Sequence, residues 1–122
     1  MDNLYYKVKL YLEANSKSVD EFNKSPKTIS LEDHNDGQGA RITFWNVDGL
    51  TKPTDSQLNA LASNATKEYN NVVIRQTRKA AYGNIGDQLD LLYKDMLAGK
   101  GDSTGEWFKS IKAVKDANPK EE

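Results

Sequence analysis

The sequence predicts an α+β fold: an N-terminal helix and one β-hairpin, followed by a mostly helical C-terminal half. Two observations lead to this prediction. Asp36-Gly37 lies between two segments in which apolar and polar residues alternate, which is typical of a hairpin. From Thr54 onward, apolar residues instead recur at helical spacing. We expect a helix-plus-hairpin unit in residues 1–53 and a helical region in 54–122, the two being separate or forming one continuous domain.

The N-terminal segment, residues 3–13, fits both a strand and a helix. Its apolar residues alternate with polar ones over the whole segment, which favours a strand. Leu4, Val8 and Leu12 also satisfy the helical spacing, and Asp2 or Asn3 is a suitable N-cap. The residues alone favour the helix only slightly.

A polar linker is expected over residues 15–25, with a short turn at 19–22 that docks Phe22. Pro26 disfavours helix at the preceding residue, so an extended segment can begin there. The first strand is expected from Thr28 to Glu32. In the second strand, Ile42, Phe44 and Asn46 alternate with Arg41, Thr43 and Trp45. The turn between them uses Asp36, Gly37 and Gly39, residues that accept a positive φ.

Three helical stretches follow the hairpin. Thr54 and Gln57 form a capping box that opens a helix reaching Tyr82, with an interruption expected at Asn70-Asn71. Gly83-Asn84 ends it, and the next helix carries an apolar stripe of Ile85, Leu89, Leu92, Tyr93 and Met96. After a glycine-rich loop over 99–105, the last helix carries Trp107, Phe108, Ile111 and Val114.

The composition excludes several classes of function. Leu, Ile, Val and Phe make up about a fifth of the 122 residues, so the core is thin and leaves little room for a deep active site. The chain has no Cys, hence no disulfide and no Cys-based zinc site. With 17 basic and 18 acidic residues, a nucleic-acid partner is not expected. No apolar run approaches the roughly 20 residues of a membrane span, and no secretory signal is recognisable, so we expect no membrane partner and synthesis in the cytoplasm.

The residues that could carry chemistry have simpler explanations. The acidic loop 32–37 departs from the EF-hand pattern, because Gly37 and Gln38 fall where Asp or Asn and then Gly are required. His34, the only histidine, has no nucleophile or second ligand in a recognisable pattern. An exposed helix face accounts for Asp87 and Asp90, and also for the basic cluster Arg75, Arg78 and Lys79. The sequence therefore predicts no catalytic residue, no metal ligand and no cofactor.

The aromatic residues are the better candidates for function. Tryptophan and tyrosine are enriched at binding hot spots. The candidate interface residues are Trp45, Trp107, Phe108, Ile111 and Val114. The stripe on the last helix has an alternative, which is to pack against Leu58, Leu61 and Leu89 within one chain.

One stretch resembles a motif of small phage tail-module proteins, including the XkdW family. It consists of a strand from Ile29, the acidic Asp-Gly turn with Gly37-x-Gly39, Ile42-x-x-Trp45-Asn46, and Pro53-Thr54-x-x-Gln57-Leu58. The resemblance covers about 30 residues and departs from the family in its longer polar stretch before the first strand. It implies a short helix before the hairpin, and so favours helix over 3–13.

A second stretch resembles the ending of many phage virion-associated and tail-fibre-region proteins. It contains Ile85-Gly86-Asp87-Gln88-Leu89-Asp90, then Trp107 and residues 111–115. Those proteins usually carry Tyr-Pro before this core, where this chain has Tyr82-Gly83. The resemblance points to a phage origin and implies no catalytic residues.

Together these resemblances imply a virion structural protein of the tail or tail-fibre region, not an enzyme, which acts through contacts with other tail proteins or with further copies of itself. Two alternatives remain at this stage. One is a tail or tail-fibre assembly chaperone that is absent from the mature virion. The other, of a different class, is a small metal-dependent hydrolase that uses Asp33, His34 and Asp36.

Overall fold

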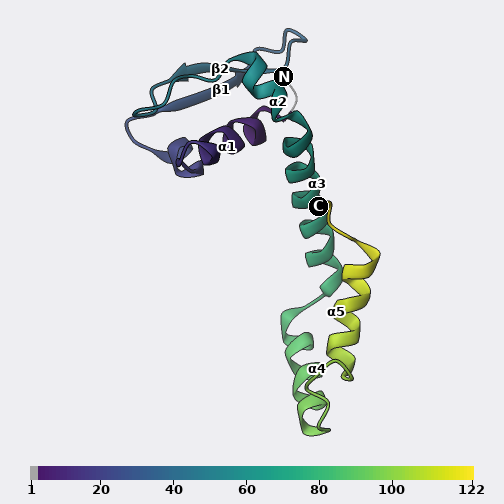
Figure 1. The fold of residues 1–122 in the computed structure, drawn as a ribbon. Helices are drawn as coiled ribbons and strands as arrows, with labels where there is room; N and C mark the ends of the chain where they lie inside the picture. Colours follow the sequence, from purple (N-terminus) through teal and green to yellow (C-terminus); the bar gives the residue numbers. More distant parts are fainter. Residues whose placement is uncertain (1–2) are drawn as a thin grey trace. The chain divides into compact units, whose positions relative to one another are not determined.

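The computed structural model describes residues 3–122 and has the α+β fold that the sequence predicts (Figure 1). Its contacts divide the chain into two compact units, residues 1–69 and 70–122, so the first unit extends past the expected boundary at residue 53. The elements are α1 (Leu4–Ala14), the 3₁₀ turn η1 (Val19–Asn23), β1 (Ile29–Asp33), β2 (Ala40–Trp45), α2 (Asp55–Ala60), α3 (Ala62–Tyr82), α4 (Ile85–Leu97) and α5 (Glu106–Ala117).

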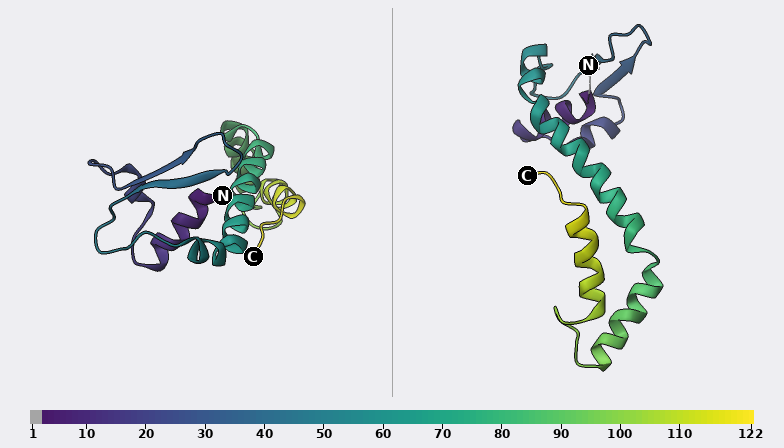
Figure 2. Two further views of the ribbon diagram at one scale, coloured as in Figure 1. Left: turned by 90° about the horizontal axis from the view of Figure 1, so that it is seen from above. Right: turned by 90° about the vertical axis from the view of Figure 1, so that its right-hand side faces the viewer.

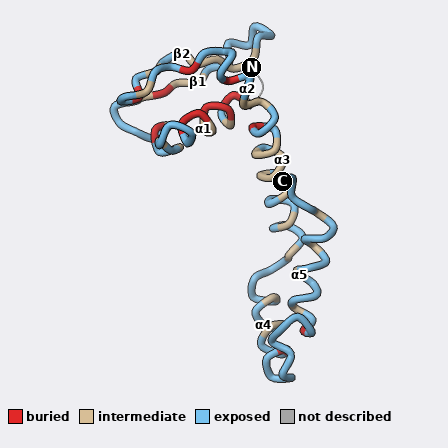
Figure 3. The backbone as a smooth tube through the Cα atoms, viewed as in Figure 1, coloured by how far each residue is buried: buried red, intermediate tan, exposed pale blue. Residues whose placement is uncertain are grey.

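The ambiguous N-terminal segment is the helix α1. Leu4, Val8 and Leu12 fall on one face of it because they are four residues apart, and all three are buried. They form the centre of the first unit's core, together with Ile29, Val47 and Leu58 (Figure 3). Tyr6 and Leu10, which would share a face with Leu4, Val8 and Leu12 in a strand, are only partly buried in the helix.

The hairpin pairs β1 and β2 antiparallel, with Asp33 opposite Ala40 and Leu31 opposite Ile42. Its register shifts between Ser30 and Leu31, which leaves Thr43 as an extra residue on β2. Because of this bulge, Ile42 and Trp45 both pack against the core, whereas Phe44 is 45% exposed. The strict alternation of β2 expected from the sequence is therefore interrupted.

Side-chain hydrogen bonds tie the loops of the first unit to its core. Tyr11 Oη donates to the Thr51 carbonyl at 2.8 Å, and Trp45 Nε1 donates to the Leu50 carbonyl at 2.8 Å. In the linker, the expected turn is η1, and its Glu21 carbonyl accepts from Thr28 Oγ1 at 2.7 Å. The linker is thus held against the start of β1.

The helical half begins as predicted but breaks at a different residue. Thr54 and Gln57 form the capping box of α2, and Leu58 is buried in the core. The chain then departs from helix at Leu61, whereas Asn70-Asn71, where an interruption was expected, lie inside an unbroken α3. Lys9 Nζ bonds Glu68 at 3.0 Å and joins α1 to the first turns of α3.

The second unit contains the last part of α3, then α4 and α5, which run antiparallel and are joined by the loop 98–105 (Figure 2). The segment after α5 returns to α3, where Arg78 Nε donates to the Asn118 carbonyl at 2.7 Å. Asn71 also exchanges two hydrogen bonds with the backbone of Glu121, at 2.8 and 2.9 Å. Polar contacts therefore hold this segment in place.

We predict that Gly37→Val destabilises the hairpin. Gly37 has a φ of +80°, and no atom lies within 4 Å of where a β-carbon would stand, so the cost comes from the backbone alone. The free energy of unfolding should fall by about 1–3 kcal/mol, as measured by chemical denaturation. Gly37→Asn is the matched control and should lose less, since asparagine tolerates this conformation. Equal stability of the valine variant and the parent would contradict the turn assignment.

Candidate functional site

The acidic turn of the hairpin is held by its own hydrogen bonds. Asp33 Oδ1 accepts from the Asn35 backbone N–H at 2.8 Å, and Asp36 accepts from the Gln38 N–H at 3.0 Å and pairs with Arg41. The hydrogen bond from Arg41 is the main reason that the pKa of Asp36 lies below its ordinary value. His34 Nε2 lies 3.2 Å from Glu32 Oε2. All of these side chains except Arg41 are exposed, and their geometry is that of a turn.

Trp45, one of the candidate interface residues, lies in the core of the first unit. It is half-buried, its ring centroid lies 6.0 Å from that of Tyr11, and its indole N–H is satisfied by Leu50. Part of its side chain is thus covered by the core of the first unit. That the remainder contacts a partner stays a prediction.

The other candidate interface residues lie together on α5, as expected. Trp107, Ile111 and Val114 are half-buried and Phe108 is exposed. Trp107, Phe108 and Ile111 line a hollow of about 410 Å³ with Lys112, Lys115 and Asp116. Leu58, one of the intramolecular partners considered above, is buried in the first unit's own core.

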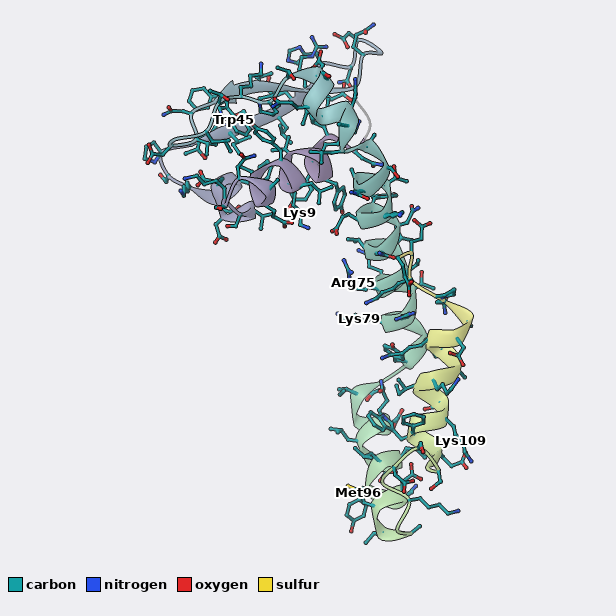
Figure 4. All side chains as sticks on the ribbon, in the orientation of Figure 1. Lys9, Trp45, Arg75, Lys79, Met96 and Lys109 are labelled. Carbon is teal, nitrogen blue, oxygen red and sulfur yellow. The ribbon has the colours of Figure 1, made fainter. Side chains whose placement is uncertain are left out.

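A row of exposed apolar side chains lies on α4. Five large side chains on this helix are each 59 to 72% exposed: Ile85, Leu89, Tyr93, Met96 and Leu97. Their spacing places them on one side of the helix, and we call this side the α4 face. Figure 4 shows Met96 on the side of α4 that points away from α5. The sequence predicted four of these residues as a stripe, with Leu92 in place of Leu97; Leu92 is half-buried. It did not show that the stripe is left uncovered in the described chain.

The stripe is uncovered because a different side of α4 packs against α5. Asp95 is 6% exposed, and its Oδ2 accepts from the Trp107 N–H, in the first turn of α5, at 2.8 Å. Gly105, the residue at the N-cap of α5, has no side chain to do this, so α4 supplies the cap. A carboxylate at a helix N-terminus also complements the helix dipole.

Gly105 is required for this close approach. A β-carbon there would overlap the Lys100 carbonyl and stand 2.8 Å from Asp95 Oδ2. The Lys100 N–H in turn donates to the Asp95 carbonyl at 2.7 Å. Sequence reasoning missed this cap, although one signal was present: Asp95 is an acidic residue in the last turn of a helix, where the dipole disfavours it.

Neither a metal site nor a membrane-spanning helix is found in the part of the chain that the structure describes. Within residues 3–122, no group of three or more His, Asp or Glu side chains could hold a metal ion, and none of the helices has the length and apolar character of a membrane span. A pocket of about 250 Å³ lies between α1, the hairpin and α2, lined in part by the core residues Leu4, Ile42 and Leu58.

No family model, curated protein or solved structure matches the chain.

We predict that Asp95→Ala loosens α5. The substitution removes the cap of α5 and should cost about 0.5–2 kcal/mol of local stability. Hydrogen exchange should then quicken at the amides of residues 107–110. Asp90→Ala is the matched control, because Asp90 is an exposed carboxylate on the same helix and pairs with Lys94 of that helix. Unchanged exchange in α5 of the Asp95 variant would show that the cap does not hold the helix.

Proposed function

We propose that this protein is a structural component of a phage tail or tail-fibre region and acts through protein–protein contacts. The observation that carries the proposal is the α4 face, five large apolar side chains left in solvent on one helix. Contiguous apolar surface of this kind commonly marks a contact with another protein.

The phage assignment rests on the two motif resemblances. The hairpin motif falls on β1, the turn, β2 and the capping box of α2, that is, on the elements that build the first unit. The Ile-Gly-Asp-Gln-Leu-Asp motif opens α4 and contributes Ile85 and Leu89 to the α4 face. The resemblance and the exposed apolar surface thus meet in the same helix.

Of the alternatives, an assembly chaperone would use the same surface and differs only in whether it stays in the finished particle. The hydrolase alternative has less support. Asp33, His34 and Asp36 are exposed, and each has a neighbour within the hairpin as its hydrogen-bond partner.

The test of the proposal is mass spectrometry of purified virions beside the infected-cell lysate. We expect the protein in the particles, at a copy number that matches a tail symmetry. Detection in the lysate together with absence from washed particles would contradict the proposal and favour the chaperone.

A second measurement addresses the hydrolase. We expect that calcium, magnesium and zinc leave the melting temperature of the purified protein unchanged. A metal that bound the folded state would stabilise it by about 2.7 kcal/mol at one hundred times its dissociation constant. If one metal raises the melting temperature and Asp36→Asn abolishes that rise, the hydrolase alternative gains over the structural role.

A further inference from the structure

We propose that the α4 face binds the α4 face of a second copy of this chain, with the two helices antiparallel about a twofold axis. This dimer rests on the proposed function in one respect: both use the α4 face as a contact surface. It specifies the occupant of that face, which the motif resemblances leave open.

The α4 face lies on a part of its helix that α5 leaves free. Asp95 is buried and Leu91 is half-buried, and both lie on the side of α4 that meets α5. The five residues of the α4 face lie on a different side of the helix, with the half-buried Leu92 at the border between the two sides. A second helix can therefore pack there without displacing α5, and each copy offers the other the same apolar surface, as a twofold contact requires.

The charges beside the α4 face favour an antiparallel pair. Asp90 and Lys94 lie side by side along one flank of the α4 face, 3.0 Å apart and both exposed. In an antiparallel helix pair, like flanks meet, and the N-terminal half of one helix faces the C-terminal half of the other. Asp90 of each copy then approaches Lys94 of the second copy. The flank with Asp90 and Lys94 is therefore complementary to the same flank of the second copy. The ion pair within each helix does not prevent this, because an exposed pair contributes little stability.

A parallel pair lacks this complementarity. In that orientation, the flank with Asp90 and Lys94 meets the opposite flank of the other helix, the one that carries Asp95 and contacts α5. The antiparallel pair also sets the two helix dipoles in the favourable, opposed orientation.

The arrangement specifies a register. A pair centred near Leu91 brings Leu89 beside Tyr93 of the second copy and Ile85 beside Leu97 of the second copy. Apolar residues thus meet along the length of α4, which its 13 residues make about 20 Å. Two helices of this length bury less than the 1,200 Å² or so of a standard interface, so we expect a weak, concentration-dependent dimer.

Sedimentation velocity from about 1 μM to about 1 mM is the first test. We expect the parent to shift from monomer to dimer across this range. Leu89→Asp should abolish the shift with an unchanged circular dichroism spectrum, since Leu89 is largely exposed. Val73→Asp is the matched control, an exposed apolar residue on α3, and should dimerise like the parent. Should Leu89→Asp fold poorly, Met96→Gln is the milder variant on the same face.

Charge reversal tests the orientation. Asp90→Lys and Lys94→Asp should each weaken the dimer, because each sets like charges against each other across the interface. The double variant restores opposite charges and should recover the affinity of the parent. Recovery supports the antiparallel pair, and failure of the double variant to recover contradicts it.

Cross-linking tests the register, since the chain has no native cysteine. A mixture of Leu89→Cys and Tyr93→Cys proteins should form the mixed disulfide in preference to either homodimer, as identified by mass. Lys109→Cys, exposed on α5, is the control and should cross-link poorly. Preferential Leu89–Leu89 pairing of the cysteine variants would indicate a parallel pair and overturn the proposal.

The outcomes separate this inference from the proposed function. A parent that stays monomeric to about 1 mM, or a dimer that survives Leu89→Asp, overturns self-association through the α4 face and leaves the structural role standing. If such a protein is still found in virions, the α4 face binds a different tail protein and the structural role stands. A dimer with the expected variants that is absent from virions overturns the structural role and leaves this inference intact.

Discussion

A small supply of apolar side chains is the constraint on which this structure depends. In the described chain, every large apolar residue that is buried lies in the first unit, on α1, the hairpin, the segment after it and α2. The apolar face of α1 packs under the hairpin, which would be marginal in water by itself. Residues 70–122 have no buried large apolar side chain, and they must be held by other means.

Polar groups at the ends of helices provide those means. Asn84 caps α4 with its own side chain, Asp95 caps α5 from α4, and Arg78 holds the segment after α5 through the Asn118 carbonyl. Such hydrogen bonds fix the directions of the helices but do not cover apolar surface. As a result, the second unit has a defined arrangement of α4 and α5 and also an exposed apolar stripe, whereas in a unit with a large core that stripe would be covered.

The fold class, the capping box and the turn glycines could be read from the sequence because local chemistry determines them. The rest depends on tertiary contacts. Thr43 is an extra residue in β2, and no local pattern marks it, because a bulge is defined by pairing with the other strand. The helix breaks at Leu61, although Asn70-Asn71 look like the weaker point, because α2 packs against α1 and α3 starts anew from there. The sequence identified the α5 stripe as a candidate site and showed most of the α4 stripe. That α4 packs against α5 through the side that carries Asp95 is a tertiary feature that no local pattern marks.

The bulge in β2 has a consequence for how copies of this protein can meet. In a two-stranded sheet, both strands are edges, and an open edge is a template for a further strand. The bulge at Thr43 interrupts the regular series of backbone donors and acceptors along β2. Along β1, Glu32 and Asp33 would place like charges near one another if two such strands aligned in parallel. The bulge and the charges therefore disfavour the addition of further strands to the sheet, and with it the fibres that such addition can start.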